Sequence, residues 1–185
     1  MNTSSAIANP SGSAGLVEAL IETLRQEADE MKRLKTHFER QLEAVRTQRL
    51  DEHEQALHEA GETVGTLGRL HIQRTRKMRL LGRVLKVEGE DVTLQQLLAA
   101  LGAHPELGAS EAALQEARAA AQAQASQARE ACEHLDFALQ YAVGLGREML
   151  QAIQALDRPP PASVYTARGD TSRAAAPSSL VNKVG

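Results

Sequence analysis

The placement of the prolines limits the possible folds of this chain more than any other feature. The chain has 185 residues and six prolines, yet between Ser11 and Arg158 only Pro105 interrupts it. Proline breaks a helix interior because its ring clashes with the preceding turn and it lacks a backbone N–H. The sequence therefore permits long uninterrupted helices over most of its length.

The composition favours helices and argues against β-rich folds. Only four residues are aromatic, two Phe and two Tyr, whereas β-sandwiches and barrels use aromatic and β-branched residues heavily. The chain is instead rich in Ala, Leu, Gln, Glu and Arg, which are strong helix formers. We therefore expect an all-α fold, a long antiparallel helical bundle or coiled-coil-like hairpin with disordered termini.

Apolar side chains spaced seven residues apart mark two long helices. One series runs from Val17 to Val45, and a second runs from Leu114 to Leu156. This spacing aligns the side chains along one stripe of a helix, as in coiled coils. The two series are Val17, Leu24, Met31, Phe38 and Val45, and Leu114, Ala121, Ala128, Leu135, Ala142, Met149 and Leu156.

The middle of the chain carries weaker helix signals. Asp51 could cap a helix that follows a turn, and a further apolar stripe reaches Lys86. We expect a short helix over Leu94–Leu101, with Asp91 or Thr93 as its N-cap. How many helices residues 15–87 form stays open.

These patterns divide the chain into three parts. Residues 1–14 are mostly Ser, Ala, Asn, Gly and Pro, and we expect a disordered leader there. Residues 15–157 are expected to form the helical bundle domain. Residues 158–185 follow three prolines, carry few apolar side chains, and are expected to form a disordered C-terminal tail.

Charge and cysteine content point to a cytoplasmic protein. The net charge is only -3, and the single cysteine, Cys132, excludes an internal disulfide and fits a reducing compartment. The first residues resemble no secretory signal, and no stretch approaches the ~20 apolar residues that a membrane span needs. We therefore expect cytoplasmic localisation without membrane insertion.

Catalytic and metal-binding patterns fail on spacing. His53 and His58 are five residues apart, whereas two zinc ligands on one helix face need a spacing of four. Cys132 and His134 lie on different faces of a helix, and no second cysteine completes a site. We expect no catalytic residue, no metal, no cofactor and no small-molecule substrate, and hence no enzyme.

A basic run between residues 63 and 87 contains seven Arg or Lys residues and no acid. It could be a nucleic-acid face, or a solvated face balanced by the acidic segment Asp51–Glu62. Because no aromatic residue is present for base stacking, we favour the solvated face and do not expect nucleic acid as a partner. Arg74 lies in the apolar arc, where it could snorkel or pair with a buried carboxylate, with Asp136 as a candidate. Five of the basic residues share one arc: Arg69, Arg76, Arg79, Arg83 and Lys86.

The element Tyr165-x-x-x-Gly169-x-Thr171 follows the proline-rich stop in the tail. This element, together with several segments that precede it in order along the chain, resembles sequence elements of the FlgN family of flagellar export chaperones, and the tail element is the most distinctive of them. At one position the chain departs from the family pattern, because Ala131 stands where members commonly carry Asn. The other matching segments are Leu20–Leu24 with Glu27, Arg74–Gly82 followed by Val92–Leu97, and Ala138–Tyr141.

The resemblance implies a non-enzymatic cytoplasmic chaperone. Such a protein would bind the C-terminal helical segment of the hook-associated proteins FlgK and FlgL and prevent their premature assembly. It would then deliver them to the export gate protein FlhA. An amphipathic client helix gains ~25 cal/mol per Å2 of apolar surface that is covered, so a groove could hold it reversibly without ATP.

Two sets of candidate residues follow. We expect the last helix to bind the client, although packing of these residues on the first helix remains an equal alternative. The tail tyrosine is expected to bind the export gate, as the resemblance implies, together with Arg168 and Gly169. The client-binding candidates are Leu135, Leu139, Ala142, Met149, Ile153 and Leu156, and the gate-binding candidates are Tyr165, Arg168 and Gly169.

A protein of another class is also compatible with these residues. It would be a structural coiled-coil protein that self-associates or contacts nucleic acid through the basic arc 69–86. Salt-dependent binding to duplex DNA would favour it, because phosphate contacts weaken steeply as salt rises. A regulatory enzyme subunit is a more distant alternative.

Overall fold

The computed structural model describes residues 10–87, 89, 92–103, 108–156, 163–165 and 171–173. The chain divides into two compact units, Met1–Leu139 and Gln140–Gly185. Four helices carry most of the described residues, which confirms the expected all-α fold. They are α1 (Pro10–Arg46), α2 (Leu50–Val84), α3 (Leu94–Gly102) and α4 (Gly108–Leu156).

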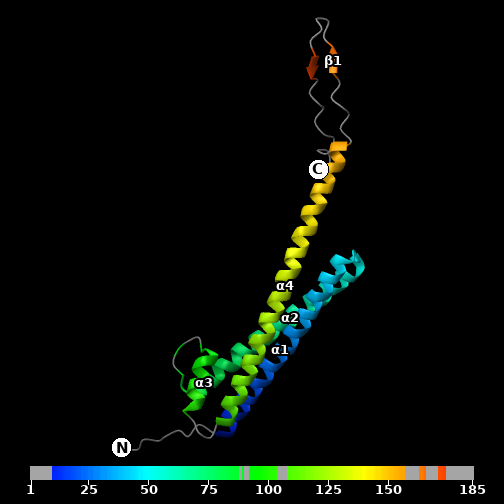
Figure 1. Ribbon diagram of the computed structural model, residues 1–185. Helices are drawn as coiled ribbons and strands as arrows, with labels where there is room; N and C mark the ends of the chain where they lie inside the picture. Colours follow the sequence, from blue (N-terminus) through cyan, green and yellow to red (C-terminus); the bar gives the residue numbers. More distant parts are fainter. Residues whose placement is uncertain are drawn as a thin grey trace, which may run out of the picture. The chain divides into compact units, whose positions relative to one another are not determined.

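In the first unit, α1 and α2 form a long antiparallel hairpin (Figure 1). Its turn is tight because Gln48 adopts a left-handed conformation with a φ of 57° and the Arg49 N–H donates to the Ala44 carbonyl at 2.9 Å. The N-cap of α2 is Arg49, which makes no side-chain cap hydrogen bond. The expected cap, Asp51, was therefore wrong, and this residue lies inside the first turn of α2.

The short helix α3 packs beside α2 at the end of the hairpin away from its turn (Figure 1). Thr93 caps it, as expected: its hydroxyl accepts from the Gln96 N–H, and the Gln96 side chain accepts from the Thr93 N–H. This capping box satisfies two backbone donors at the start of the helix. It fixes the position at which the chain enters α3.

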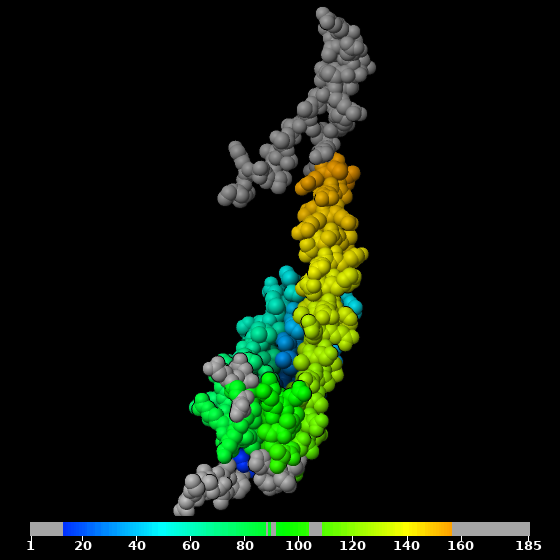
Figure 2. Space-filling model, turned by 90° about the vertical axis from the view of Figure 1, so that its left-hand side faces the viewer, coloured from blue at the N-terminus to red at the C-terminus, as the bar shows by residue number. Residues whose placement is uncertain are grey.

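The first part of α4 lies against α1 and runs in the same direction (Figure 1). Lys35 of α1 donates to Gln127 of α4 at 3.3 Å, and Ala117 and Ala128 are buried. Figure 2 shows this arrangement from another side, with α1 (blue) between α2 and α4.

The core of the first unit lies where all four helices meet. Nine buried residues form one cluster, and the leucines of α2, α3 and α4 within it are fully buried. Val17 and Leu24, the first two of the five residues in the series predicted for α1, therefore face this core rather than a second coiled-coil strand. The cluster contains Val17, Leu20, Ile21, Leu24, Leu81, Leu97, Leu101, Leu114 and Ala117.

In the second unit, two three-residue strands pair antiparallel, β1 (Ser163–Tyr165) and β2 (Thr171–Arg173). Tyr165 lies opposite Thr171 in this register. The sequence analysis did not predict these strands. Strands this short contain too few residues to show an alternating pattern.

Candidate functional site

The last seventeen residues of α4, 140–156, carry an apolar face that no described residue of the chain buries. Met149 and Ile153 are each 57% exposed and Leu156 is 87% exposed. At 3.6 residues per turn, Gln140 and Gln151 lie on the other side of the helix. This part of α4 is therefore an amphipathic helix whose apolar side faces water. We call this the α4 apolar face; it contains Ala142, Val143, Leu145, Met149, Leu150, Ile153 and Leu156.

The structure separates the six predicted client-binding residues into two groups. Leu135 is buried and Leu139 is half-buried, and both belong to the first unit. The other four belong to the second unit and are exposed: Ala142, Met149, Ile153 and Leu156. The sequence-based set omitted three exposed members of the same face, Val143, Leu145 and Leu150. The available signal was helical spacing: Leu145 is three residues from Ala142 and four from Met149, Leu150 is three from Ile153, and Val143 is four from Leu139.

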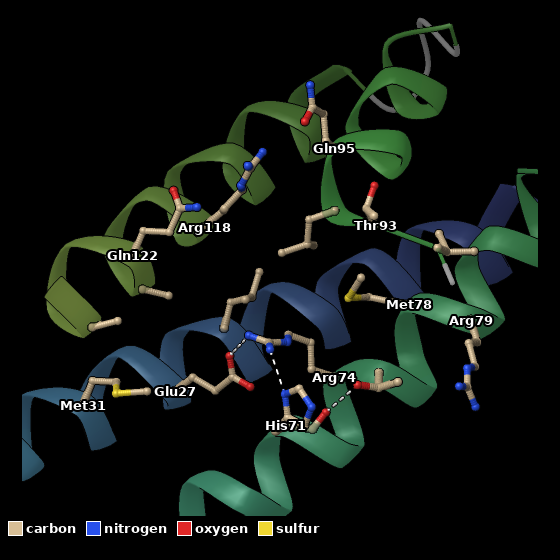
Figure 3. A pocket seen from close by; sticks show the side chains of 16 residues that line it. Glu27, Met31, His71, Arg74, Met78, Arg79, Thr93, Gln95, Arg118 and Gln122 are labelled. Carbon is tan, nitrogen blue, oxygen red and sulfur yellow. Dashed lines mark hydrogen bonds and ion pairs between the residues drawn. The ribbon is translucent and has the colours of Figure 1, made fainter. Parts of the chain in front are cut away.

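A second candidate site is an open groove of about 560 Å3 in the first unit. Residues of all four helices and the segment before α3 line it (Figure 3). Its walls combine apolar side chains such as Met31 and Met78 with the polar side chains Arg118 and Gln122 of α4. Such a mixture can receive an amphipathic segment.

An ion pair between α1 and α2 forms part of this groove (Figure 3). Arg74 Nη1 donates to Glu27 Oε2 at 2.6 Å, and Arg74 Nη2 lies 2.9 Å from His71 Nδ1. The Glu27 side chain is only 7% exposed, and its Oε1 has no hydrogen-bond partner among the residues that the structure describes. The carboxylate that Arg74 meets is thus Glu27, and the suggestion of Asp136, which is exposed, was wrong.

Burial raises the pKa of Glu27 above its ordinary value. The charges of Arg74 and His71 and the hydrogen bond from Arg74 act in the opposite direction, but burial has the larger effect. A carboxylate removed from water is costly unless it is paired and hydrogen-bonded. Glu27 therefore depends on Arg74 for its charged state.

Some residues of the basic run in α2 make contacts with α1 inside the hairpin. Besides the pairing of Arg74, the Lys77 ammonium donates to the Ala19 carbonyl at 3.0 Å and to the Thr23 hydroxyl. Arg76 and Arg83 are exposed. The run is therefore a mixture of hairpin contacts and solvated side chains rather than one continuous anion-binding face.

The predicted gate-binding residues lie in the tail. Tyr165 ends β1, and its backbone partner Thr171 begins β2. The first and last residues of the tail element are thus opposite each other in one ladder. Arg168 and Gly169 lie outside the described residues.

Within the described residues, no group of three or more His, Cys, Asp or Glu side chains is placed to hold a metal ion. In the same residues, no helix is both long enough and apolar enough to cross a membrane.

Comparison with known proteins assigns the family. The model of the FlgN family, described as FlgN protein, matches residues 16–173, which include α2, α3, α4, both strands and most of α1. Searches of curated proteins and of solved structures gave no match. The family is one of flagellar chaperones rather than enzymes. Since the match covers far more than half of the sequence, this chain belongs to the FlgN family.

Proposed function

We propose that this chain is a cytoplasmic export chaperone for the hook-associated proteins FlgK and FlgL. It binds their C-terminal helical segment, prevents premature assembly and delivers them to the export gate protein FlhA, without enzymatic activity. Membership of the FlgN family supports a role in binding flagellar proteins. The observation that carries the proposal is the exposed α4 apolar face.

The α4 apolar face has the shape and chemistry that a client helix requires. Its large side chains are about half exposed or more, and covering one of them fully is worth about 1.5–3 kcal/mol. A client's amphipathic helix gains the same stabilisation from its own apolar side. Two such helices pack by inserting ridges into grooves, so binding needs no bond formation and no ATP.

We assign client binding to Ala142, Met149, Ile153 and Leu156, which are accessible in the free chain. Leu139 is half-buried and could add to the edge of the contact. Leu135 is 6% exposed and packs in the first unit, so its apolar surface is already covered. The client would therefore contact the exposed residues first.

The double substitution Met149→Asp and Ile153→Asp is expected to weaken capture of full-length FlgK at least about tenfold. Each aspartate would place a charge where the client's apolar side must pack, and a buried unpaired charge is costly. The matched control is Gln151→Asp with Ala155→Asp, two exposed positions with the same spacing, which adds the same charge to the opposite side of α4. Binding can be measured by calorimetry or quantitative pull-down.

The control variant should bind FlgK like the unmodified chain. Circular dichroism should show the same helix content in all three proteins. If the Met149/Ile153 variant keeps this helix content and still binds FlgK with unchanged affinity, the assignment of the α4 apolar face is wrong.

We further propose that Tyr165, with Arg168 and Gly169, binds FlhA. The family resemblance of the tail element supports this role, and pairing of Tyr165 with Thr171 holds the two ends of that element together. An aromatic side chain supplies a large apolar contact with few rotatable bonds, which suits a short docking segment.

Tyr165→Ala is therefore expected to weaken binding of the FlgK-loaded chaperone to FlhA by about tenfold or more, with FlgK binding unchanged. Tyr165→Phe removes the hydroxyl but keeps the aromatic ring. This variant should keep most of the affinity for FlhA if packing of the ring dominates binding. Surface plasmon resonance with immobilised FlhA can measure both variants. Unchanged FlhA affinity in Tyr165→Ala would refute this role.

A further inference from the structure

A second apolar strip lies on α2, in the first unit, and is separate from the α4 apolar face. Leu57, Val64 and Ile72 are 56%, 53% and 69% exposed, and Leu50, at the start of the helix, is 68% exposed. Spacings of seven, seven and eight residues place these four on one side of the helix. Gly61 and Gly68 lie on the same side and are exposed. We call this set of six residues the α2 strip.

The charges beside the α2 strip change sign at its middle. From Leu50 to Glu62 the helix has five acidic residues and no Lys or Arg, whereas from Thr63 to Val84 it has six basic residues and no acid. A helix with one acidic half and one basic half is complementary to a second copy of itself in the antiparallel orientation. Two parallel copies would instead bring like charges together.

The apolar positions obey the same two-fold relation. If a symmetry axis passes near Val64 and Gly65, Leu57 of one chain meets Ile72 of the other, and Gly61 meets Gly68. The same register places Glu54 within one position of the partner's Arg76 and Glu62 within two positions of the partner's Arg69, on the same side of the contact. The glycines next to the axis carry no side chain, so two helices can approach closely there.

The surface beside the basic half of the strip is hollowed. A depression of about 540 Å3 is lined by residues that include Ile72, Thr75, Arg76 and Leu80. In the antiparallel register, the partner's Leu57 and Glu54 would lie over this depression. An apolar side chain and a carboxylate match its lining of apolar and guanidinium groups.

We propose that the α2 strip is the contact surface for a second copy of this chain, in a two-fold homodimer with antiparallel α2 helices. Glu54 and Arg76 make no ion pair within the described residues and are both exposed, so they are available to pair across the dimer. An isologous contact of this kind closes on itself, since each chain offers both halves of the complementary surface.

The first test is the mass of the full-length chain in solution, measured by sedimentation equilibrium over a range of concentrations. The expected mass is twice the 19.9 kDa of one chain. Val64→Asp places two aspartates beside the axis and should raise the dimer dissociation constant at least about tenfold. Ile153→Asp, on the α4 apolar face, should leave it unchanged. A monomer at all concentrations would overturn the proposal.

Charge exchange tests the register. Glu54→Arg and Arg76→Glu should each weaken the dimer, because each places like charges together twice in a two-fold contact. An equimolar mixture of the two variants should form heterodimers with restored affinity, since every contact between positions 54 and 76 then joins opposite charges. The proposal is overturned if the mixture stays as weak as either variant, or if Ile153→Asp rather than Val64→Asp separates the chains. Client binding is measured separately, so the two proposals can fail independently.

Discussion

Leu114→Ala is expected to lower the free energy of unfolding by about 2–5 kcal/mol. Leu114 is fully buried near the start of α4, in the cluster where all four helices meet. The substitution removes apolar contacts and leaves a cavity that the surrounding leucines can fill only in part. The effect should be large because the other buried residues in this part of α4 are mainly alanines, Ala117, Ala128 and Ala131, with Leu135.

Leu150→Ala is the matched control, because it makes the same chemical change in the same helix. Leu150 is 60% exposed, so the expected loss is below about 1 kcal/mol. Urea denaturation followed by circular dichroism measures both variants, and equal slopes would show that the unfolding reaction is the same. Similar losses for the two leucines would contradict the assignment of Leu114 to the core.

The long helices could be predicted because their information is local. The apolar series in α1 and α4 can be recognised from the seven-residue spacing within one segment. The Thr93 cap can be recognised from four consecutive residues. The glycines of α2 show the limit of this reasoning. Each weakens an isolated helix by about 1 kcal/mol, yet α2 is continuous from Leu50 to Val84 because packing on α1 outweighs that cost.

The candidate site could be predicted only in part, because spacing does not reveal which side chains are covered. Leu135 and Met149 occupy equivalent positions in the same series, yet Leu135 is buried and Met149 is 57% exposed. The difference depends on where the neighbouring helices lie, which is not encoded in the spacing. The same reason explains Arg74: its place in an apolar arc left snorkelling and a buried carboxylate as alternatives, and the actual partner, Glu27, lies 47 residues away along the chain.

Replacing Arg74 by methionine is expected to lower the free energy of unfolding by about 2–4 kcal/mol at pH 7. Methionine preserves much of the apolar stem but removes the only side chain that donates to Glu27 in the described residues, where one carboxylate oxygen already lacks a partner. Breaking a buried ion pair costs about 3–5 kcal/mol because a charge is left without compensation. The lower range applies here because the Arg74 side chain is 28% exposed.

The loss should depend on pH in a defined direction. Burial already raises the pKa of Glu27 above the ordinary value of 4.5, and removing Arg74 takes away the largest opposing influence. The folded variant therefore binds a proton more readily than the unfolded chain, so its stability relative to the unmodified protein falls as pH rises from 4.5 through the raised pKa. Below pH 4.5 the carboxyl is neutral in both states, and most of the loss should disappear.

Adding Glu27→Gln to the Arg74→Met variant tests the cause. The amide has nearly the same shape as the carboxyl but cannot ionise, so the double variant should regain stability at pH 7 and lose the added pH dependence. Urea denaturation at pH 4 and pH 7 measures all three proteins. If Arg74→Met costs the same at both pH values, the uncompensated charge of Glu27 is not the source of the loss. The contribution of Arg74 would then come from packing of its stem between the helices.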